Sequence, residues 1–213
     1  CAAINPEKIQ RGIHSPELQV ALSRFEVTIC DGIGVSLACW MLHGRKLPRV
    51  TGCDLATSMI GRAAERQWPI YLLGGTRQSN AQALKNVGAR YPQLPIAGGR
   101  DGYFEDAAPI IEAINRSGAR LLLVGMGSPY QEFWIQTHRA QLDVPLIMGV
   151  GGTIDVLGGM AKRAPRFVRA VGLEFLYRLV RHPGRIKRQL ALPRYVLRVF
   201  AEAVARKPRE LGA

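Results

Sequence analysis

The sequence predicts an α/β fold with a mostly parallel sheet and helices on both of its faces. Two observations predict it: short, continuously apolar runs alternate with longer stretches of helical periodicity, and each apolar run leads into a glycine-rich turn. Strands buried on both faces have such continuous runs, and their alternation with helices is typical of parallel sheets. The chain has 213 residues, 47% of them hydrophobic, which is enough for one such core and an appendage.

The predicted elements follow one another regularly along the chain. Five apolar runs predict strands over Val27–Cys30, Pro69–Leu73, Leu94–Ala97, Arg120–Val124 and Pro145–Val150. The helical stretches between them predict helices over Asp54–Gln67, Arg77–Tyr91, Ala107–Ser117 and Pro129–Gln141. We therefore expect the strands to share one sheet, with their carboxyl ends at the same edge.

Glycine-rich loops follow the predicted strands, at Gly32, Gly74-Gly75, Gly98-Gly99, Gly125–Gly127 and Gly151-Gly152. Ligands of open α/β sheets bind outside the carboxyl ends of the strands, where glycine lets the backbone approach a phosphate closely. Several such loops in register predict a nucleotide site. The alternative is that they are simply tight turns between strands and helices.

Charge divides the chain near residue 160. Residues 1–160 contain 15 Lys and Arg against 13 Asp and Glu, whereas residues 161–213 contain 14 against 3. The sequence thus predicts a core over 1–160 and a basic, helical C-terminal appendage over 161–213. Apolar residues recur beside Lys and Arg from Ile186 to Ala205, with an expected interruption at Pro193, which is typical of a helix lying in a membrane interface.

Cysteine usage and the chain ends give smaller clues. The four cysteines form no Cys-x-x-Cys pair, so we expect free thiols, as in a reducing cytoplasm. No run of eighteen apolar residues is present. The chain begins at Cys1 within an apolar pattern, so we expect a further N-terminal segment.

Several common sites lack their sequence signatures. The chain contains no Gly-x-x-x-x-Gly-Lys-Ser/Thr and no Gly-x-Ser-x-Gly, which argues against a P-loop NTPase and an α/β-hydrolase. The loop Gly125–Tyr130 lacks the third glycine of a dinucleotide fingerprint, which disfavours an oxidoreductase. No Asp-x-Asp is present to bridge a metal to a diphosphate, so amides, a helix N-terminus or arginine would have to meet that charge.

Asp31 stands directly after a predicted strand and before Gly32-Ile33-Gly34. A carboxylate at this end of a sheet can act as a general base. It can equally serve as the N-cap of the next helix, and spacing alone favours neither role.

The chain resembles the WecG/TagA/CpsF family of glycosyltransferases from about Asn5 to Arg188. Eight ordered segments carry the resemblance: Asp31-Gly-Ile-Gly34, Arg49-Val-Thr-Gly-Cys-Asp54, Leu72-Leu-Gly-Gly75, Gly102-Tyr-Phe104, Leu123-Val-Gly-Met-Gly-Ser-Pro-Tyr-Gln-Glu-Phe-Trp134, Met148-Gly-Val-Gly-Gly-Thr-Ile-Asp155, Arg163-Ala-Pro165 and Gly172-Leu-Glu-Phe-Leu-Tyr-Arg-Leu179. Together with the periodicity, the resemblance predicts a Rossmann-like sheet.

The resemblance implies an activity. Members of this family transfer a sugar from a UDP-sugar to a saccharide on a polyprenyl diphosphate, with inversion and without a metal or other cofactor. They work at the cytoplasmic face of the membrane, as peripheral proteins, in cell-surface polysaccharide synthesis. The resemblance therefore implies an anionic membrane surface as a partner. It leaves open the donor sugar, the acceptor saccharide and self-association of the core.

The resemblance also implies roles for residues of the core. Asp31 matches the family's proposed base, Arg49 an arginine near the diphosphate, and Gln131 an active-site glutamine. Tyr103 and Asp155 match positions lining the uridine pocket, although Tyr103 could also be a core residue. Gly125, Gly127 and Ser128 would offer backbone amides. Asn5 matches a substrate-binding position, whereas Ala3 stands where the family commonly has threonine, which points to altered acceptor contacts.

The appendage has two expected roles. Arg178, Arg185 and Arg188 match arginines that complete the family's active site when the appendage docks, and they could also bind anionic lipid. A competing interpretation of the basic appendage is a nucleic-acid-binding module. Its apolar stripe fits a membrane better, so we expect no nucleic-acid partner.

Overall fold

The computed structural model describes residues 1–165, 167–168, 177 and 191–210. The N-terminal elements are β1 (Ala2–Ile4), α1 (Pro6–His14), α2 (Pro16–Ser23), β2 (Thr28–Cys30), α3 (Ile33–His43) and α4 (Gly52–Glu65). After them come β3 (Ile70–Gly74), α5 (Arg77–Arg90), β4 (Ile96–Arg100), α6 (Ala108–Arg116), β5 (Leu121–Gly125), α7 (Tyr130–His138), η1 (Arg139–Gln141), β6 (Leu146–Gly149), α8 (Thr153–Leu157) and α12 (Ala191–Glu210).

The six strands form one sheet in the order β2-β1-β6-β5-β3-β4. Pairing is parallel between β1 and β6, β6 and β5, β5 and β3, and β3 and β4. The prediction of a mostly parallel sheet is therefore confirmed. The parallel register brings the carboxyl ends of β3 and β5 together, with Gly74 opposite Gly125.

The chain divides into two compact units. Unit 1 comprises residues 1–3, 20–28 and 52–162, and unit 2 comprises residues 4–19, 29–51 and 163–213. The change of unit after Lys162 lies close to the predicted boundary at residue 160, but unit 2 also contains two N-terminal segments. The division into a core and an appendage stays a prediction.

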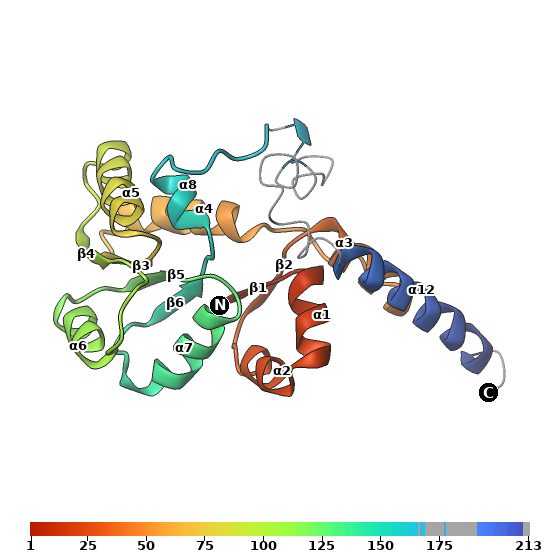
Figure 1. Ribbon diagram of the computed structural model, residues 1–213. Helices are drawn as coiled ribbons and strands as arrows, with labels where there is room; N and C mark the ends of the chain where they lie inside the picture. The colour runs from red at the N-terminus through yellow and green to blue at the C-terminus, as the bar shows by residue number, and fades with distance from the viewer. Residues whose placement is uncertain (166, 169–176, 178–190, 211–213) are drawn as a thin grey trace. The chain divides into compact units, whose positions relative to one another are not determined.

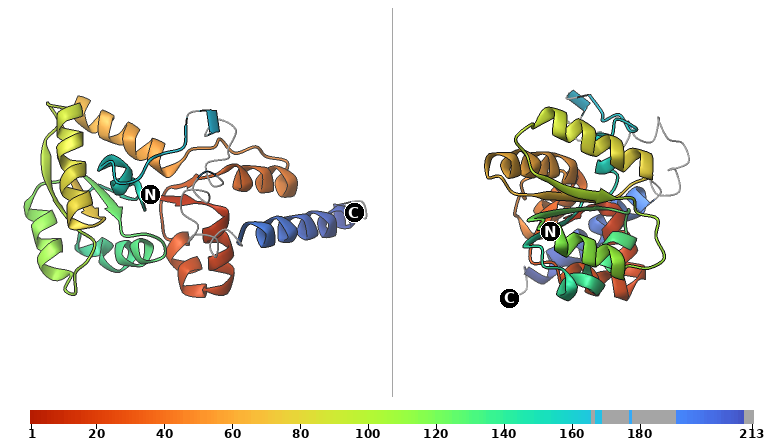
Figure 2. Two further views of the ribbon diagram at one scale, coloured as in Figure 1. Left: turned by 45° about the horizontal axis from the view of Figure 1, so that its top comes forward. Right: turned by 90° about the vertical axis from the view of Figure 1, so that its left-hand side faces the viewer.

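Unit 1 is a sheet covered on both faces. Figure 1 shows α4, α5 and α8 on one face and α6 and α7 on the other, and the turned views of Figure 2 agree. Every residue of β3 and β5 is buried, as the continuous apolar runs predict. Successive side chains alternate between the faces, and Leu73 and Val124 pack with Ile114 of α6 and Ile135 of α7.

The predicted end of the strand expected over Leu94–Ala97, which corresponds to β4, is wrong. Gly98 and Gly99 were expected to form a loop after Ala97, but they lie inside β4. A Cβ on Gly98 would come within 2.9 Å of the Tyr71 ring, and one on Gly99 within 2.5 Å of Asn80 Oδ1. These glycines therefore make room for the neighbouring strand and helix rather than for a turn.

Unit 2 has a small core of its own. Ala38 of α3 packs with Tyr195 and Val199 of α12, and Ile9, Met41 and Leu42 lie against them. The Tyr195 hydroxyl lies 3.4 Å from the carbonyl oxygen of Gly34, to which it donates. Burial raises the pKa of Tyr195 to about 12, and the nearby Cys30 and Cys39 thiols contribute further. A neutral phenol thus joins the C-terminal helix to α3.

The C-terminal helix corrects a second expectation. α12 runs through Pro193, which lies in its first turn and does not break this helix, whereas residues 186–190 of the expected stretch lie outside the described residues. Proline is tolerated there because the first backbone N–H groups of a helix need no intrahelical acceptor.

The other predicted helical stretch, Leu173–Val180, lies outside the described residues apart from helical Tyr177. Within the described part of the chain, no helix is both long and apolar enough to cross a membrane.

Candidate active site

The candidate residues fall into two groups, one on each unit. Asn5, Asp31 and Arg49 belong to unit 2, whereas Tyr103, Gln131, Asp155 and the glycine-rich loop Gly125–Ser128 belong to unit 1. Arg178, Arg185 and Arg188 lie outside the described residues.

Asp31 lies directly after β2, at the start of the connection to α3. Its backbone N–H donates to the carbonyl oxygen of Ile4 at the end of β1, over 2.8 Å. The N-cap of α3 is Gly32, with φ of 106°, a conformation that glycine adopts readily. Because the cap position belongs to Gly32, the structure does not favour the capping role for Asp31.

Arg49 lies on a segment of unit 2 that is hydrogen-bonded to the segment carrying Asp31. The backbone N–H of Val50 donates to the carbonyl oxygen of Cys30 over 2.9 Å, which joins the residue after Arg49 to the residue before Asp31. Burial raises the pKa of the Cys30 thiol, the charge of Asp31 raises it further, and Arg49 opposes the rise. Both charged side chains therefore lie within electrostatic reach of one thiol, and Cys30 is free, as expected.

Asn5 has a structural task at the start of α1. It is the N-cap of this helix, and its Oδ1 accepts from the backbone N–H of Lys8 at 2.9 Å. Pro6 follows at the first helical position. The predicted contact of Asn5 with substrate stays a prediction, and Oδ1 is already engaged in the helix cap.

In unit 1, the loops at the carboxyl ends of three strands are joined by backbone hydrogen bonds. Gly75 N–H donates to Gly125 O at 3.0 Å, and Gly102 N–H donates to Gly75 O at 2.9 Å. A Cβ on Gly125 would come within 2.7 Å of Gly151 O and of the Ile154 side chain. The loops after β3, β4 and β5 thus meet at one place, although the loop after β4 makes this contact through Gly102 and not through the expected Gly98-Gly99.

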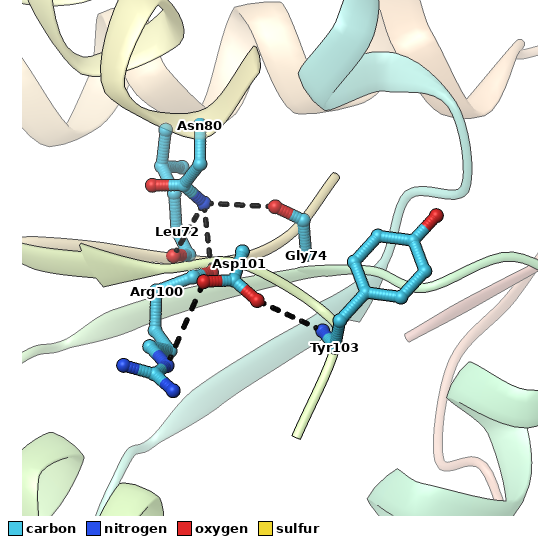
Figure 3. Close-up of polar contacts among 6 residues, drawn as sticks. All are labelled: Leu72, Gly74, Asn80, Arg100, Asp101 and Tyr103. Carbon is cyan, nitrogen blue, oxygen red and sulfur yellow. Dashed lines mark hydrogen bonds and ion pairs between the residues drawn. The ribbon is translucent and has the colours of Figure 1, made fainter. Parts of the chain in front are cut away.

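Tyr103 and Asp155 both lie at this cluster of loops. Tyr103 follows β4 and is 74% exposed, which excludes the alternative that it is a core residue. Its backbone N–H donates to Asp101 Oδ1 at 3.0 Å (Figure 3). Asp155, in α8, accepts at Oδ1 from the Ser79 hydroxyl at 2.7 Å. An exposed aromatic ring and an oriented carboxylate are suited to a base and its sugar.

Gln131 is buried at the start of α7 and is 2% exposed. Its Nε2 donates to Glu132 Oε1 at 2.7 Å, and its Oε1 accepts from Gly151 N–H at 2.9 Å. Its backbone N–H donates to Gly127 O at 2.9 Å. Gln131 therefore ties the loop after β5 to the loop after β6, and its predicted contact with the donor stays a prediction.

Ser79 and Asn80, in the first turn of α5, are functional candidates that the sequence analysis missed. Both are buried; Ser79 hydrogen-bonds to Asp155 in α8, and Asn80 hydrogen-bonds to carbonyl groups of β3 and of the end of β4. The available signal was their position, three and four residues after Thr76, which caps α5.

In the described part of the chain, no three His, Cys, Asp or Glu side chains are grouped to hold a metal ion. Catalysis without a metal or cofactor stays a prediction.

Comparison with known proteins identifies the family. The model of the glycosyl transferase WecG/TagA/CpsF family matches residues 1–209. A relative from Bacillus spizizenii, the N-acetylglucosaminyldiphosphoundecaprenol N-acetyl-beta-D-mannosaminyltransferase, is 32% identical over 209 residues, which cover 98% of this chain and 81% of that protein. The chain therefore belongs to the WecG/TagA/CpsF family and is a glycosyltransferase.

Proposed function

We propose that this chain is an inverting glycosyltransferase that moves a sugar from a UDP-sugar to a saccharide carried on a polyprenyl diphosphate. The observation that carries the proposal is the 32% identity, over 98% of the chain, to a relative named for transfer of N-acetylmannosamine to N-acetylglucosaminyldiphosphoundecaprenol. The sequence motifs that predict this chemistry lie within the matched residues.

Asp31 acts as the general base. Its carboxylate takes the proton from the acceptor hydroxyl as that oxygen attacks the anomeric carbon of the donor sugar. The bond from that carbon to the diphosphate breaks on the opposite side, so the configuration inverts in one displacement. The position of Asp31 at the carboxyl end of β2, before the Gly32 cap, supports this role.

Arg49 meets the charge that develops on the leaving diphosphate. A guanidinium offers a planar fork of donors that matches phosphate oxygens and keeps its charge throughout. The backbone bond between Cys30 and Val50 supports this role, because it holds the loop that carries Arg49 near Asp31. The arginine would thus act on the leaving group while Asp31 acts on the nucleophile.

Unit 1 binds the uridine diphosphate. Tyr103 offers an exposed ring to the uracil, and Asp155 offers a carboxylate to the ribose hydroxyls. The loop Gly125–Ser128 offers backbone amides, and Gly127 is suited to close approach because a Cβ there would meet nothing within 4 Å. The meeting of these loops at the carboxyl edge of the sheet supports this assignment.

The C-terminal appendage holds the enzyme at the cytoplasmic face of the membrane as a peripheral protein. α12 exposes an apolar stripe that includes Val196, Phe200 and Val204, on a segment with 14 Lys and Arg against 3 acidic residues. Such a helix suits an anionic lipid surface, since apolar side chains insert while basic ones meet the headgroups. The stripe favours lipid over nucleic acid as the partner.

A transfer assay tests the proposed function. The full chain would be incubated with a panel of radiolabelled UDP-sugars and a short-chain lipid diphosphate bearing N-acetylglucosamine. We expect one donor to yield a labelled lipid-linked disaccharide and UDP. Failure of every UDP-sugar, with transfer from a sugar carried on another nucleotide, would contradict the proposed donor class.

A further inference from the structure

The first turn of α5 presents two polar side chains to the protein interior. Ser79 is 1% exposed and Asn80 is 3% exposed. Burying a polar group costs free energy unless it is hydrogen-bonded, so buried polar side chains mark specific partners. The partners of both residues lie in β3, at the end of β4 and in α8, next to the loops to which we assign nucleotide binding.

Asn80 joins the carboxyl ends of two neighbouring strands. Its side-chain amide donates to the carbonyl oxygens of Leu72 at 3.0 Å, Gly74 at 2.9 Å and Arg100 at 2.9 Å (Figure 3). Leu72 and Gly74 belong to β3, whereas Arg100 ends β4. The amide is the suitable group because its two protons can be shared among three carbonyls, and no carboxylate could replace it.

The loop that Asn80 fixes leads directly to Tyr103. Asp101 accepts from the Tyr103 backbone N–H, and Gly102 donates to Gly75 just beyond β3. A Cβ on Gly102 would lie 3.1 Å from the Gly74 Cα, so the loop is packed closely against the end of β3. Figure 3 shows the Tyr103 ring pointing away from Asn80 and Asp101. The loop thus presents the ring outward from a backbone that Asn80 anchors.

Ser79 holds the other predicted uridine-binding side chain. Its hydroxyl donates to Asp155 Oδ1 at 2.7 Å, across 76 residues of sequence. Ser79 is itself fixed because its backbone N–H donates to the side chain of Thr76, the N-cap of α5, at 3.1 Å. This bond occupies one carboxylate oxygen and so sets the direction of the second.

We propose that Ser79 and Asn80 are positioning residues for the donor nucleotide. Ser79 orients the Asp155 carboxylate toward the ribose, and Asn80 fixes the loop that presents Tyr103 to the uracil. One helical turn thereby sets the spacing between the base contact and the ribose contact. The inference rests on the proposed function, in which Tyr103 and Asp155 bind uridine.

A double-mutant cycle tests the role of Ser79. The dissociation constant for UDP would be measured by calorimetry on the full chain for the wild type, Ser79→Ala, Asp155→Ala and the double variant. We expect Ser79→Ala to weaken UDP binding roughly fivefold, the scale of one lost hydrogen bond. In the Asp155→Ala background the same change should have no further effect, because its target is gone.

A matched control separates positioning from support of the fold. Gln78→Ala changes an exposed residue in the same turn of α5 and should leave UDP binding unchanged. A purely structural role for Ser79 predicts a lower melting temperature with normal UDP affinity below that temperature. A role in UDP binding that does not act through Asp155 predicts instead that the losses of UDP affinity caused by Ser79→Ala and Asp155→Ala multiply in the double variant.

The role of Asn80 is tested through the loop it anchors. Asn80→Asp keeps the shape but turns a carboxylate toward three carbonyl oxygens. We expect faster hydrogen exchange at the Gly102 and Tyr103 amides and weaker UDP binding. In a Tyr103→Ala background, Asn80→Asp should cause no further loss of UDP affinity. If Asn80→Asp does not fold, the Ser79 cycle still decides the proposal.

The outcomes distinguish this inference from the proposed function. Normal UDP affinity in Ser79→Ala, or an undiminished effect of Ser79→Ala without the Asp155 carboxylate, would overturn the inference alone. Failure of the wild-type chain to bind UDP would overturn the proposed donor and this inference with it.

Discussion

The backbone N–H of Val50 lies 2.9 Å from the carbonyl oxygen of Cys30 and donates to it. This bond joins Val50, the residue after Arg49, to Cys30, the residue before Asp31, although the two lie 20 positions apart in the chain. A carboxylate and a guanidinium thereby come from two adjoining backbone segments of unit 2. In the proposed reaction, the first deprotonates the nucleophile and the second stabilises the leaving group.

Replacing Arg49 by lysine tests whether the fork of the guanidinium matters in addition to its charge. We expect Arg49→Lys to lower kcat about tenfold or more, because a lysine ammonium cannot bind two phosphate oxygens side by side. Steady-state transfer kinetics measure it. Arg45→Lys, at an exposed position of the same connection, is the control and should keep the wild-type kcat. A wild-type kcat in Arg49→Lys would remove Arg49 from the leaving-group role.

Gly125 tests how tightly the loops at the carboxyl edge are packed. We expect Gly125→Ala to weaken UDP binding and to lower stability by roughly 1–3 kcal/mol, because the added Cβ would collide with Gly151 O and Ile154. Gly12→Ala is the control: Gly12 lies in α1 with nothing within 4 Å of a Cβ, so it should gain about 0.5–1 kcal/mol. Urea denaturation measures both, and equal stability of the two variants would contradict this packing.

The raised pKa of Tyr195 predicts that the folded chain loses stability at alkaline pH. Its pKa is raised to about 12 in the folded chain from the ordinary value of 10.0, mainly by burial. Its contribution to stability is therefore complete below about pH 10 and is lost as the pH rises toward 12, because only the unfolded chain ionises readily. We expect Tyr195→Phe to flatten the fall in unfolding free energy over this range, measured by urea denaturation.

Tyr130→Phe is the matched control for this pH dependence. It removes an exposed phenol from unit 1 and should leave the alkaline slope of the wild type unchanged. If Tyr195→Phe also kept the full slope, the phenol between α3 and α12 would not be the group responsible.

The exposed stripe of α12 tests attachment to the membrane. We expect the combined variant Val196→Ser, Phe200→Ser, Val204→Ser to bind vesicles of phosphatidylglycerol and phosphatidylethanolamine about tenfold more weakly, because inserted apolar area is lost. Vesicle flotation measures it. Ala201→Ser with Ala205→Ser, two exposed positions off the stripe, should bind like the wild type. Unchanged flotation of the triple variant would contradict insertion of this stripe.

The parts of the fold that could be predicted from sequence are those with a strong local pattern. The apolar runs of β3 and β5 are recognisable because strands that are buried on both faces are continuously apolar. The amphipathic helix α4 is recognisable because burial of one face gives its apolar residues a helical periodicity. The short strand β1 and the nearly uniformly apolar helix α3 leave no such pattern, and neither was predicted. The candidate catalytic roles of Asp31 and Arg49 came from the family resemblance, because periodicity alone does not single these residues out.

The rest depends on contacts between residues distant in the chain. Ser79 and Asn80 resemble ordinary polar residues of an amphipathic helix, and only the fold shows that they face Asp155 and the strand ends. Gly98 and Gly99 resemble a turn, but their role is to admit a tyrosine ring and an asparagine. Pro193 resembles a break, because a sequence does not show where a helix begins.

Asp31→Asn tests the central claim most directly. The amide keeps the shape of the side chain but cannot accept the proton of the acceptor hydroxyl. We expect transfer from the UDP-sugar to the lipid-linked acceptor to fall about 10²–10⁴-fold while the dissociation constant for UDP stays at its wild-type value. Transfer at the wild-type rate by Asp31→Asn would contradict the assignment of Asp31 as the base, and with it the proposed mechanism.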